Sequence, residues 1–407
     1  MNTILAHPED IAVCTGCAAC SAVCPSDSIT MQADAEGFLY PRINADTCTD
    51  CRLCRQTCPA DPEATMNLKR ADVGSEFPKV FAAWNLDGDI RRQSSSGGVF
   101  TALAEDILSR GGVVVGAAFD DDLVVKHVCV EKGGELHRLR GSKYVQSEVA
   151  PTIHRRIRAL LEQGRRVLFS GTPCQVAGLR AFLKQSFENL FCCDLICHGV
   201  PSPKLFARYV GHSTENRDRV VRVDFRDKTN GWKSFGVRQQ RENGESLFST
   251  MHADPYIQAF LRNYALRPAC YACAFATTSR FGDLTLGDFW EVAKKYPEYD
   301  RDDKGTSLLL VNNVKGESWL DACRPKLFLG LADLATAIAG NPMLVHSSRR
   351  PPHRDVFYRD LEVMEISPFI KKYRLEGQLY RSRILSNIAR RVKAIADTLS
   401  GRHRMED

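Results

Sequence analysis

Cysteine dominates the chemistry that this sequence can support. The chain of 407 residues contains 16 cysteines, and eight of them form two copies of one pattern near the N-terminus. In each copy, two residues lie between the first and second cysteines and two between the second and third. Three residues lie between the third and fourth cysteines, and a proline follows the fourth. The two copies are Cys14, Cys17, Cys20 and Cys24, and then Cys48, Cys51, Cys54 and Cys58. Thiolates at such short spacing are typical ligands of metals or iron–sulfur clusters.

The spacing of both copies is that of bacterial ferredoxins with two [4Fe–4S] clusters, in which the fourth cysteine binds the other cluster. We therefore assign one cluster to Cys14, Cys17, Cys20 and Cys58, and the other to Cys48, Cys51, Cys54 and Cys24. A pair of zinc sites is the alternative, but zinc binds two pairs of ligands and does not need this spacing. We expect a ferredoxin-like domain over residues 1–62, with a strand, a turn and a strand over residues 29–43.

Composition restricts the class of protein. With 44% hydrophobic and 26% charged residues the chain is typical of globular proteins, and its length suggests two or three domains. No run reaches the ~20 apolar residues of a membrane span, and residues 1–10 lack the features of a secretory signal. We therefore expect a cytoplasmic protein whose cysteines bind redox cofactors rather than form disulfides.

Positive charge is concentrated near the C-terminus. The net charge is +6, but residues 371–404 contain ten Lys and Arg against two acidic residues. The rest of the chain is slightly acidic, which argues against nucleic-acid binding. Residues 366–407 are expected to form a basic helical tail with an apolar stripe from Ile384 to Leu399. Such a helix binds an anionic membrane surface or an acidic partner, or it packs on its own domain.

Residues 63–78 are polar without a sustained period, and we expect them to be a linker. Beyond them, residues 94–98 (Ser-Ser-Ser-Gly-Gly) precede a helical stripe of Val99, Leu103 and Ile107. Ser95 or Ser96 is the expected N-cap of this helix. A helix N-terminus with small residues favours a phosphate, and a plain capped helix is the alternative.

Two later segments share a layout of strand, small-residue loop and helix. Residues 166–170 predict a buried strand that leads through Gly171, Thr172 and Cys174 into a helix. Residues 193–196 predict the next strand, which is followed by Cys197 and His198 and then another helix. This repetition predicts an α/β sheet with ligands at the carboxyl ends of its strands.

Taken together, these stretches resemble the beta-subunit family of coenzyme F420-reducing hydrogenases and dehydrogenases. The resemblance runs from about residue 77 to residue 352, and it rests on residues 94–98, 140–147, 170–175, 194–199, 270–273 and 282–290. Members are iron–sulfur flavoproteins that bind FAD and pass electrons between clusters and a two-electron carrier or an organic substrate. The fused two-cluster ferredoxin occurs in only part of the family.

The resemblance implies a fold class of α+β or α/β. A bacterial-ferredoxin-like domain would be followed by an α/β domain over residues 79–365 that binds FAD and iron–sulfur, and then by the helical tail. The turn at residues 94–98 and Lys143 would bind the FAD pyrophosphate. The implied FAD-binding residues are Ser94, Ser95, Ser96, Gly97, Gly98, Ser142, Lys143, Tyr144, Gly171 and Thr172. The alternatives are a solvated Lys143 and a packed Tyr144.

A third [4Fe–4S] cluster is predicted in this domain, because the family has a cluster at these motifs. Its ligands would be Cys174, Cys197, Cys270 and Cys273. Adjacent predicted strands place Cys174 and Cys197 on one rim of the sheet, and the other two follow a paired spacing. Zinc is the alternative occupant. The remaining cysteines are interpreted as small buried hydrophobic residues, and they are Cys129, Cys192, Cys193 and Cys323.

His198 is the candidate proton donor, since imidazole titrates near neutral pH, although its ring can equally satisfy a loop carbonyl. We expect an oxidoreductase that receives electrons from a ferredoxin-like donor or reduced F420. It would pass them through the clusters and FAD to an unknown organic substrate. The alternative is a non-catalytic electron-transfer subunit of a larger redox complex.

Overall fold

The computed structural model describes residues 12–62, 64, 76–214 and 218–376. Most of the expected linker, and the apolar stripe from Ile384 to Leu399, lie outside the described residues. None of the described helices is long and apolar enough to cross a membrane.

The N-terminal unit is small and built around one hairpin. It comprises α2 (Ala19–Val23), β1 (Ile29–Ala33), β2 (Leu39–Ile43) and α3 (Leu53–Gln56). The strands are antiparallel with Ile29 opposite Ile43. The Asp34 carboxylate accepts hydrogen bonds from the amides of Glu36 and Phe38, and Gly37 adopts a positive φ of 86°. These features set the tight turn, so the expected strand, turn and strand are confirmed.

An eight-stranded mixed sheet is the largest element, in the order β13-β3-β12-β11-β7-β6-β4-β5. Its strands are β3 (Lys79–Asn85), β4 (Val113–Phe119), β5 (Val125–Val130), β6 (Val167–Gly171), β7 (Leu190–Leu195), β11 (Leu284–Asp288), β12 (Ser307–Val311) and β13 (Leu327–Ala332). The central strands β4, β6, β7 and β11 are parallel, and antiparallel strands extend the sheet on both sides. The expected α/β sheet is therefore present as the centre of a mixed one.

Helices cover the faces of this sheet. They are α5 (Gly88–Arg92), α6 (Val99–Ser109), α7 (Pro151–Glu162), α8 (Pro173–Leu183), α11 (Val314–Cys323) and α12 (Leu334–Gly340). Val99, Leu103 and Ile107 of α6 are buried as predicted. Thr172 begins α8 with a capping box to Gln175.

The predicted N-cap of α6 is wrong. Neither Ser95 nor Ser96 caps the helix, which begins after Gly98 at a positive φ of 83° without a side-chain cap. The reason is that the preceding turn packs on the sheet. The Asn85 amide donates to the carbonyl of Gly97, and the Gly97 amide donates to Ser307 Oγ at 2.9 Å. A Cβ at Gly97 would lie 2.3 Å from the Ala83 carbonyl oxygen, so only glycine permits this approach.

A second, smaller layer lies beside the large sheet. It contains β8 (Val220–Asp227), β9 (Gly236–Arg241), β10 (Ser246–Thr250), α9 (Pro203–Thr214), α10 (Pro255–Leu261), α13 (Arg354–Val363) and α14 (Ile366–Lys372). Aromatic rings form its centre, with Phe206, Phe225 and Tyr256 in mutual contact. Ile366, Phe369 and Ile370 are buried in this layer, so the first turns after residue 365 pack on the body.

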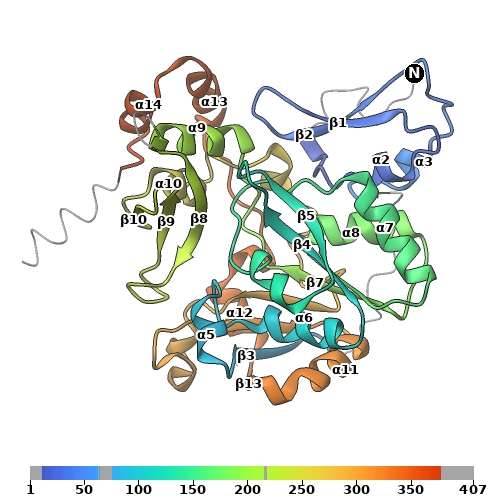
Figure 1. Cartoon of the computed structure of the whole chain (residues 1–407), viewed down its shortest axis with the longest axis vertical. Helices are drawn as coiled ribbons and strands as arrows, with labels where there is room; N and C mark the ends of the chain where they lie inside the picture. Colours follow the sequence, from blue (N-terminus) through green and yellow to red (C-terminus); the bar gives the residue numbers. More distant parts are fainter. Residues whose placement is uncertain (1–11, 63, 65–75, 215–217, 377–407) are drawn as a thin grey trace, which may run out of the picture.

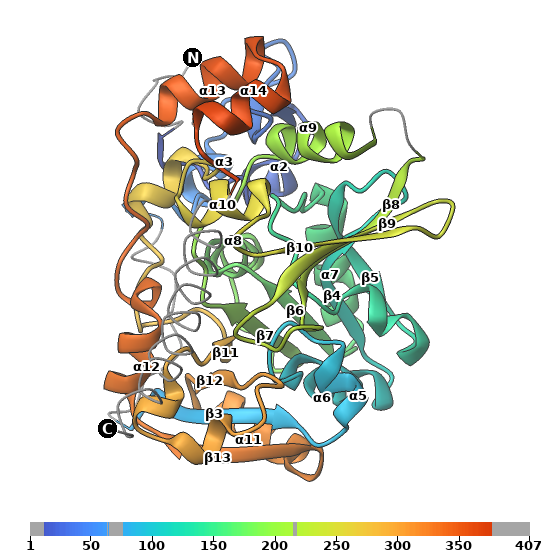
Figure 2. The same cartoon turned by 90° about the vertical axis from the view of Figure 1, so that its left-hand side faces the viewer.

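Figures 1 and 2 show the N-terminal unit at one end of the molecule and β13 at the other. Helix α2 packs against α7 and α8 of the body. The contact is close, because a Cβ added at Gly178 of α8 would lie 2.8 Å from Cys17 Sγ. The first cysteine motif is therefore packed directly on the larger domain.

Candidate functional site

The two N-terminal motifs fold into matching loops. Gly16 and Asp50 occupy equivalent positions in the two motifs and both have positive φ, at 72° and 48°. Ala18 and Arg52 are also equivalent, and both begin a short helix in the left-handed conformation at φ 61° and 60°. Two non-glycine residues in this conformation are unusual, so the repetition reflects one shared loop structure.

Three thiols of the first motif and one of the second lie close together. We call them the first thiol set, and they are Cys14, Cys17, Cys20 and Cys58. Burial raises the pKa of Cys17, and the neighbouring Cys58 and Cys14 raise it further. Burial also raises the pKa of Cys20, and so do Cys17, Cys14 and Cys58. The members of this set are the four residues assigned above to one cluster.

The second thiol set is more open to solvent and comprises Cys48, Cys51, Cys54 and Cys24. Cys48 and Cys51 are exposed, whereas Cys24 and Cys54 are half-buried. Burial raises the pKa of Cys54, and the nearby Cys51 and Cys24 add to the shift. Cys24 thus lies near the second motif, as Cys58 lies near the first.

The body thiol set lines a separate cavity of about 40 Å³, and its members are Cys174, Cys197, Cys270 and Cys273. Cys174 lies in the first turn of α8, and Cys197 follows β7. Cys270 belongs to the 3-10 helix η2 (Pro268–Ala272), and Cys273 is its C-cap. The structure therefore brings together four thiols from three separate segments of the chain.

Burial and mutual repulsion both act on these thiols. Burial raises the pKa of Cys174 to about 11 and that of Cys270 to about 12. Burial also raises the pKa of Cys197, with further contributions from the other three members. The Val200 amide donates to Cys270 Sγ at 3.3 Å, and Thr172 Oγ1 lies 3.1 Å from Cys174 Sγ. Among the described residues, no three Cys, His, Asp or Glu side chains form a group that could hold a single metal ion.

The remaining cysteines lie apart from these sets. Cys192, Cys193 and Cys323 are buried and Cys129 is half-buried. The first three therefore pack as small hydrophobic residues, as predicted, while Cys129 is partly accessible.

A large cavity of about 740 Å³ lies at the carboxyl ends of the parallel strands β6, β7 and β11, a volume within the range of cofactor sites. Nearly all residues assigned to FAD line it, namely Ser94, Ser95, Ser96, Gly98, Ser142, Lys143, Tyr144, Gly171 and Thr172. Gly97 is the exception, because it is buried against β3. The structure thus gathers three separate sequence motifs around one space.

Polar groups of this wall are hydrogen-bonded to other groups of the protein. Ser142 Oγ donates to Ser95 Oγ at 2.9 Å and so joins the 94–98 turn to the following motif. Lys143 Nζ donates to the carbonyls of Arg138 and Arg140 at 3.0 and 2.7 Å. Burial lowers the pKa of Lys143 to about 7. Lys143 is therefore a positioned, half-buried amine rather than a solvated surface lysine.

Two charged residues of the cavity wall were not identified as a pair from the sequence. Arg226 of β8 donates to both carboxylate oxygens of Asp288 at 2.6 and 3.2 Å, and to the Tyr144 hydroxyl at 3.2 Å. Trp232 Nε1 also donates to Asp288 at 2.9 Å. Burial opposes the charge of Arg226, but Asp288 and Tyr144 keep its pKa above the ordinary value. Asp288 thus orients Arg226, and no sequence motif pointed to Arg226.

His198 lies between the two cavities and lines both. Its Nε2 pairs with Asn263 Oδ1 at 2.7 Å, and the ring also bonds the backbone of Phe260 in α10, so a side-chain amide and a backbone group both hold the imidazole. Burial lowers its pKa. Thr15 and Cys197 also line both cavities, which places the body thiol set directly beside the large cavity.

Comparison with known proteins gives consistent matches. The coenzyme F420 hydrogenase/dehydrogenase beta subunit N-terminal model matches residues 80–154, and the C-terminal model of the same subunit matches residues 164–336. A 4Fe-4S dicluster domain model matches residues 13–61. Together the two beta-subunit models span more than half of the chain.

Two relatives extend this result. An F(420)H(2) dehydrogenase subunit of Methanosarcina mazei is 26% identical over 317 residues, which are 72% of this chain and 83% of that protein. A chain in the xenon-derivatised F420-reducing [NiFe] hydrogenase complex from Methanosarcina barkeri is 17% identical, with a TM-score of 0.43. That match covers 70% of this chain and 98% of the other, at a score too low to establish a common fold. From its sequence matches, the chain belongs to the coenzyme F420 hydrogenase/dehydrogenase beta-subunit family and has an N-terminal 4Fe-4S dicluster domain.

Proposed function

We propose that this chain is an iron–sulfur flavoprotein oxidoreductase that passes electrons between a one-electron carrier and a two-electron carrier or substrate. The observation that supports this most is the order of the sites. The second thiol set, with Cys48 and Cys51 exposed, lies beside the first set, because Cys24 and Cys58 each lie near the other motif. The first set lies beside the body thiol set, and the cavity of the body set shares wall residues with the large cavity.

The junction between the first and body thiol sets is short. Cys17 packs against Gly178, which lies one helical turn after Cys174 on the same face of α8. The Thr15 side chain is a hydrogen-bond partner that favours the thiolate of Cys174, and Thr15 also lines the cavity of the body set. Clusters bound at both sets would therefore be neighbours, which favours iron over a redox-inert zinc ion at the body set.

The residues of the large cavity fit FAD. Hydroxyl groups and the Lys143 amine suit the pyrophosphate, while the wall also offers apolar surface for the rings. When bound, FAD exchanges single electrons with clusters and electron pairs with a substrate. The chain's own residues would orient it, with Arg226 and Asp288 fixing the Tyr144 side of the wall. His198, held by Asn263, is the proposed proton donor at the side nearest the thiols.

Reduced F420 is the favoured two-electron carrier, because the relative from Methanosarcina mazei is named for F420H2 dehydrogenation. A ferredoxin-like donor at the second thiol set is the alternative source of electrons, and an organic substrate at the large cavity would receive them. The alternative role is a non-catalytic electron-transfer subunit of a larger complex. That alternative is supported by the relative from Methanosarcina mazei, which is named as a subunit of a dehydrogenase.

The test is flavin analysis and reduction of the anaerobically purified chain. We expect about one FAD per chain on denaturation, and bleaching of the bound flavin by reduced F420. Protein that contains no flavin after reconstitution with FAD would overturn the proposal. Flavin reduction by ferredoxin, without turnover of any two-electron carrier, would favour the subunit role instead.

A further inference from the structure

We propose that Arg267 is a positioning residue and a fixed positive charge shared by two cluster sites, where it raises the reduction potentials of both. The sites are those of the first and body thiol sets. This inference rests on the proposed function, because it requires a cluster at each site.

Arg267 reaches the first thiol set through its side chain, and the residue is 1% exposed. Its Nε donates to the carbonyl of Cys14 at 2.7 Å, and Nη2 lies 3.6 Å from Cys14 Sγ. Nη2 also donates to the carbonyl of Leu39 at 3.0 Å. The guanidinium packs over the ring of Tyr40 at 4.0 Å, which fixes its plane. The charge is thus held at one edge of the first set.

Arg267 reaches the body thiol set through its backbone. It is the N-cap of η2, and its carbonyl accepts a hydrogen bond from the Cys270 amide at 2.9 Å. The residue lines the same cavity as Cys174, Cys270 and Cys273. One residue therefore contacts a predicted ligand of each site, although Cys14 and Arg267 are 253 residues apart in the sequence.

The charge of Arg267 has no carboxylate partner among the described residues. Its Nη1 is buried and donates to no acceptor in the part of the chain that the structure describes. Three other buried arginines differ, since Arg226, Arg280 and Arg354 are paired with Asp288, Asp194 and Glu36. A buried cation without a counter-charge is unfavourable, and clusters held by thiolates would supply the missing negative charge.

A fixed cation beside a cluster changes its redox equilibrium. Reduction adds one negative charge, so a nearby cation stabilises the reduced cluster more than the oxidised one. Charge and hydrogen bonding around the sulfur atoms are the known determinants of such potentials. Arg267 would therefore raise both potentials and favour electron occupancy at the junction between the N-terminal unit and the body.

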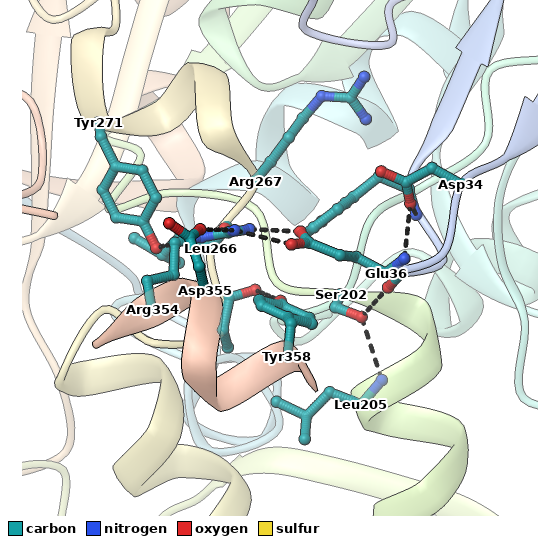
Figure 3. Close-up of polar contacts among 12 residues, drawn as sticks. Asp34, Glu36, Ser202, Leu205, Leu266, Arg267, Tyr271, Arg354, Asp355 and Tyr358 are labelled. Atoms are coloured by element: carbon teal, nitrogen blue, oxygen red, sulfur yellow. Dashed lines mark hydrogen bonds and ion pairs between the residues drawn. The ribbon is translucent and has the colours of Figure 1, made fainter. Parts of the chain in front are cut away.

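Arg354 offers a matched control, and Figure 3 shows the two residues in the same region. Its guanidinium is equally buried and also bonds a backbone carbonyl, that of Leu266. Unlike Arg267, it pairs with the carboxylate of Glu36, and the guanidinium of Arg267 lies apart from this pair (Figure 3). A substitution at Arg354 thus perturbs the same interface between unit and body without removing a charge beside a thiol.

The experiment is an anaerobic redox titration of the full chain followed by electron paramagnetic resonance, with wild type, R267Q, R267K and R354Q. We expect R267Q to shift two of the three clusters to more negative potentials and to leave the cluster of the second thiol set unchanged. R267K should lie between R267Q and wild type, and R354Q should match wild type. Unshifted potentials in R267Q, or an equal shift in R354Q, would overturn the inference.

Iron content distinguishes the remaining outcomes. Iron lost from R267Q but retained in R267K supports the need for a charge at this position. Loss from both variants shows a requirement for arginine's shape alone and overturns the inference. A wild-type chain without clusters at the two sites overturns the proposed function as well, whereas unshifted potentials in an iron-replete chain overturn this inference only.

Discussion

At the scale of single residues, we expect the proposed contact of Lys143 with FAD to make FAD binding depend on pH. Burial lowers its pKa to about 7, and a pyrophosphate binds the protonated form. Above pH 7, binding must therefore include uptake of a proton. We expect the FAD affinity of the flavin-free protein to fall by up to about tenfold per pH unit between about pH 7 and 9. Fluorescence titration with FAD at several pH values measures this.

Substitutions at the same position provide the controls. K143R retains its charge throughout this range, so its FAD affinity should be independent of pH. K143A should bind FAD more weakly, also without the pH dependence. If the FAD affinity of the wild-type protein is as independent of pH as that of K143R, Lys143 does not contact the pyrophosphate.

Residues differ in how far the sequence could predict them. The N-terminal cysteines lie close together in the chain, so their spacing alone indicated which thiols of the two motifs would meet. Arg226 and Arg267 have no such pattern, because each acts through a neighbour that is distant in sequence. Whether a single arginine is solvated or buried beside a thiol depends on tertiary packing, which no local pattern encodes.

At the scale of elements, Gly178 of α8 determines how closely the N-terminal unit approaches. A Cβ there would lie 2.8 Å from both the Sγ and the Cβ of Cys17. We expect G178A to lose about four iron atoms per chain, the content of one cluster, and to be destabilised. This loss should occur even though alanine favours a helix by about 1 kcal/mol over glycine. Iron analysis and thermal unfolding measure both effects.

Gly211 of α9 is the matched control, because a Cβ added there would meet no atom of the described residues within 4 Å outside the backbone of its own helix. G211A should keep all iron and gain about 0.5–1 kcal/mol of stability. If G178A behaves like G211A, the contact between Cys17 and α8 is not needed for the cluster.

The elements that surround the thiols were predicted more accurately than the sheet as a whole. The β6 and β7 strands and the helices after them follow short local patterns, and the structure confirms them to within a few residues. The prediction of an N-cap at Ser95 or Ser96 was wrong because β3 and Ser307, which are distant in sequence, bind the turn before α6. The mixed order of the sheet also depends on pairing between distant segments, such as β3 with β12 and β13.

At the scale of the whole molecule, an ion pair joins the N-terminal unit to the body. Arg354 of α13 donates to both carboxylate oxygens of Glu36 at 2.8 and 2.5 Å, and its side chain is 2% exposed. Figure 3 shows the pair beside Ser202, whose hydroxyl donates to the Glu36 carbonyl. We expect E36A to destabilise the protein by about 3 kcal/mol, since it removes the bidentate carboxylate of a buried guanidinium and leaves it only the longer ion pair with Asp355 at 3.8 Å.

Denaturant unfolding and hydrogen exchange of residues 29–43 measure that effect. E131A is the control, because Glu131 pairs with Arg156 and Arg165 at the surface of the body. It should cost less than about 1 kcal/mol. Equal stability of E36A and E131A, with unchanged exchange in the hairpin, would show that the Glu36 pair does not secure the unit.

The proposed electron path requires three cluster sites in series between the protein surface and the large cavity. Anaerobic analysis of iron, zinc and acid-labile sulfide tests it most directly. We predict about 12 iron atoms per chain, and about 8 in a variant with Cys270→Ser and Cys273→Ser that keeps the spectra of the other clusters. Cys323→Ser, a change at a buried thiol outside the three sets, should keep about 12. A wild-type chain with about 8 iron atoms and one zinc ion would contradict a cluster at the body thiol set.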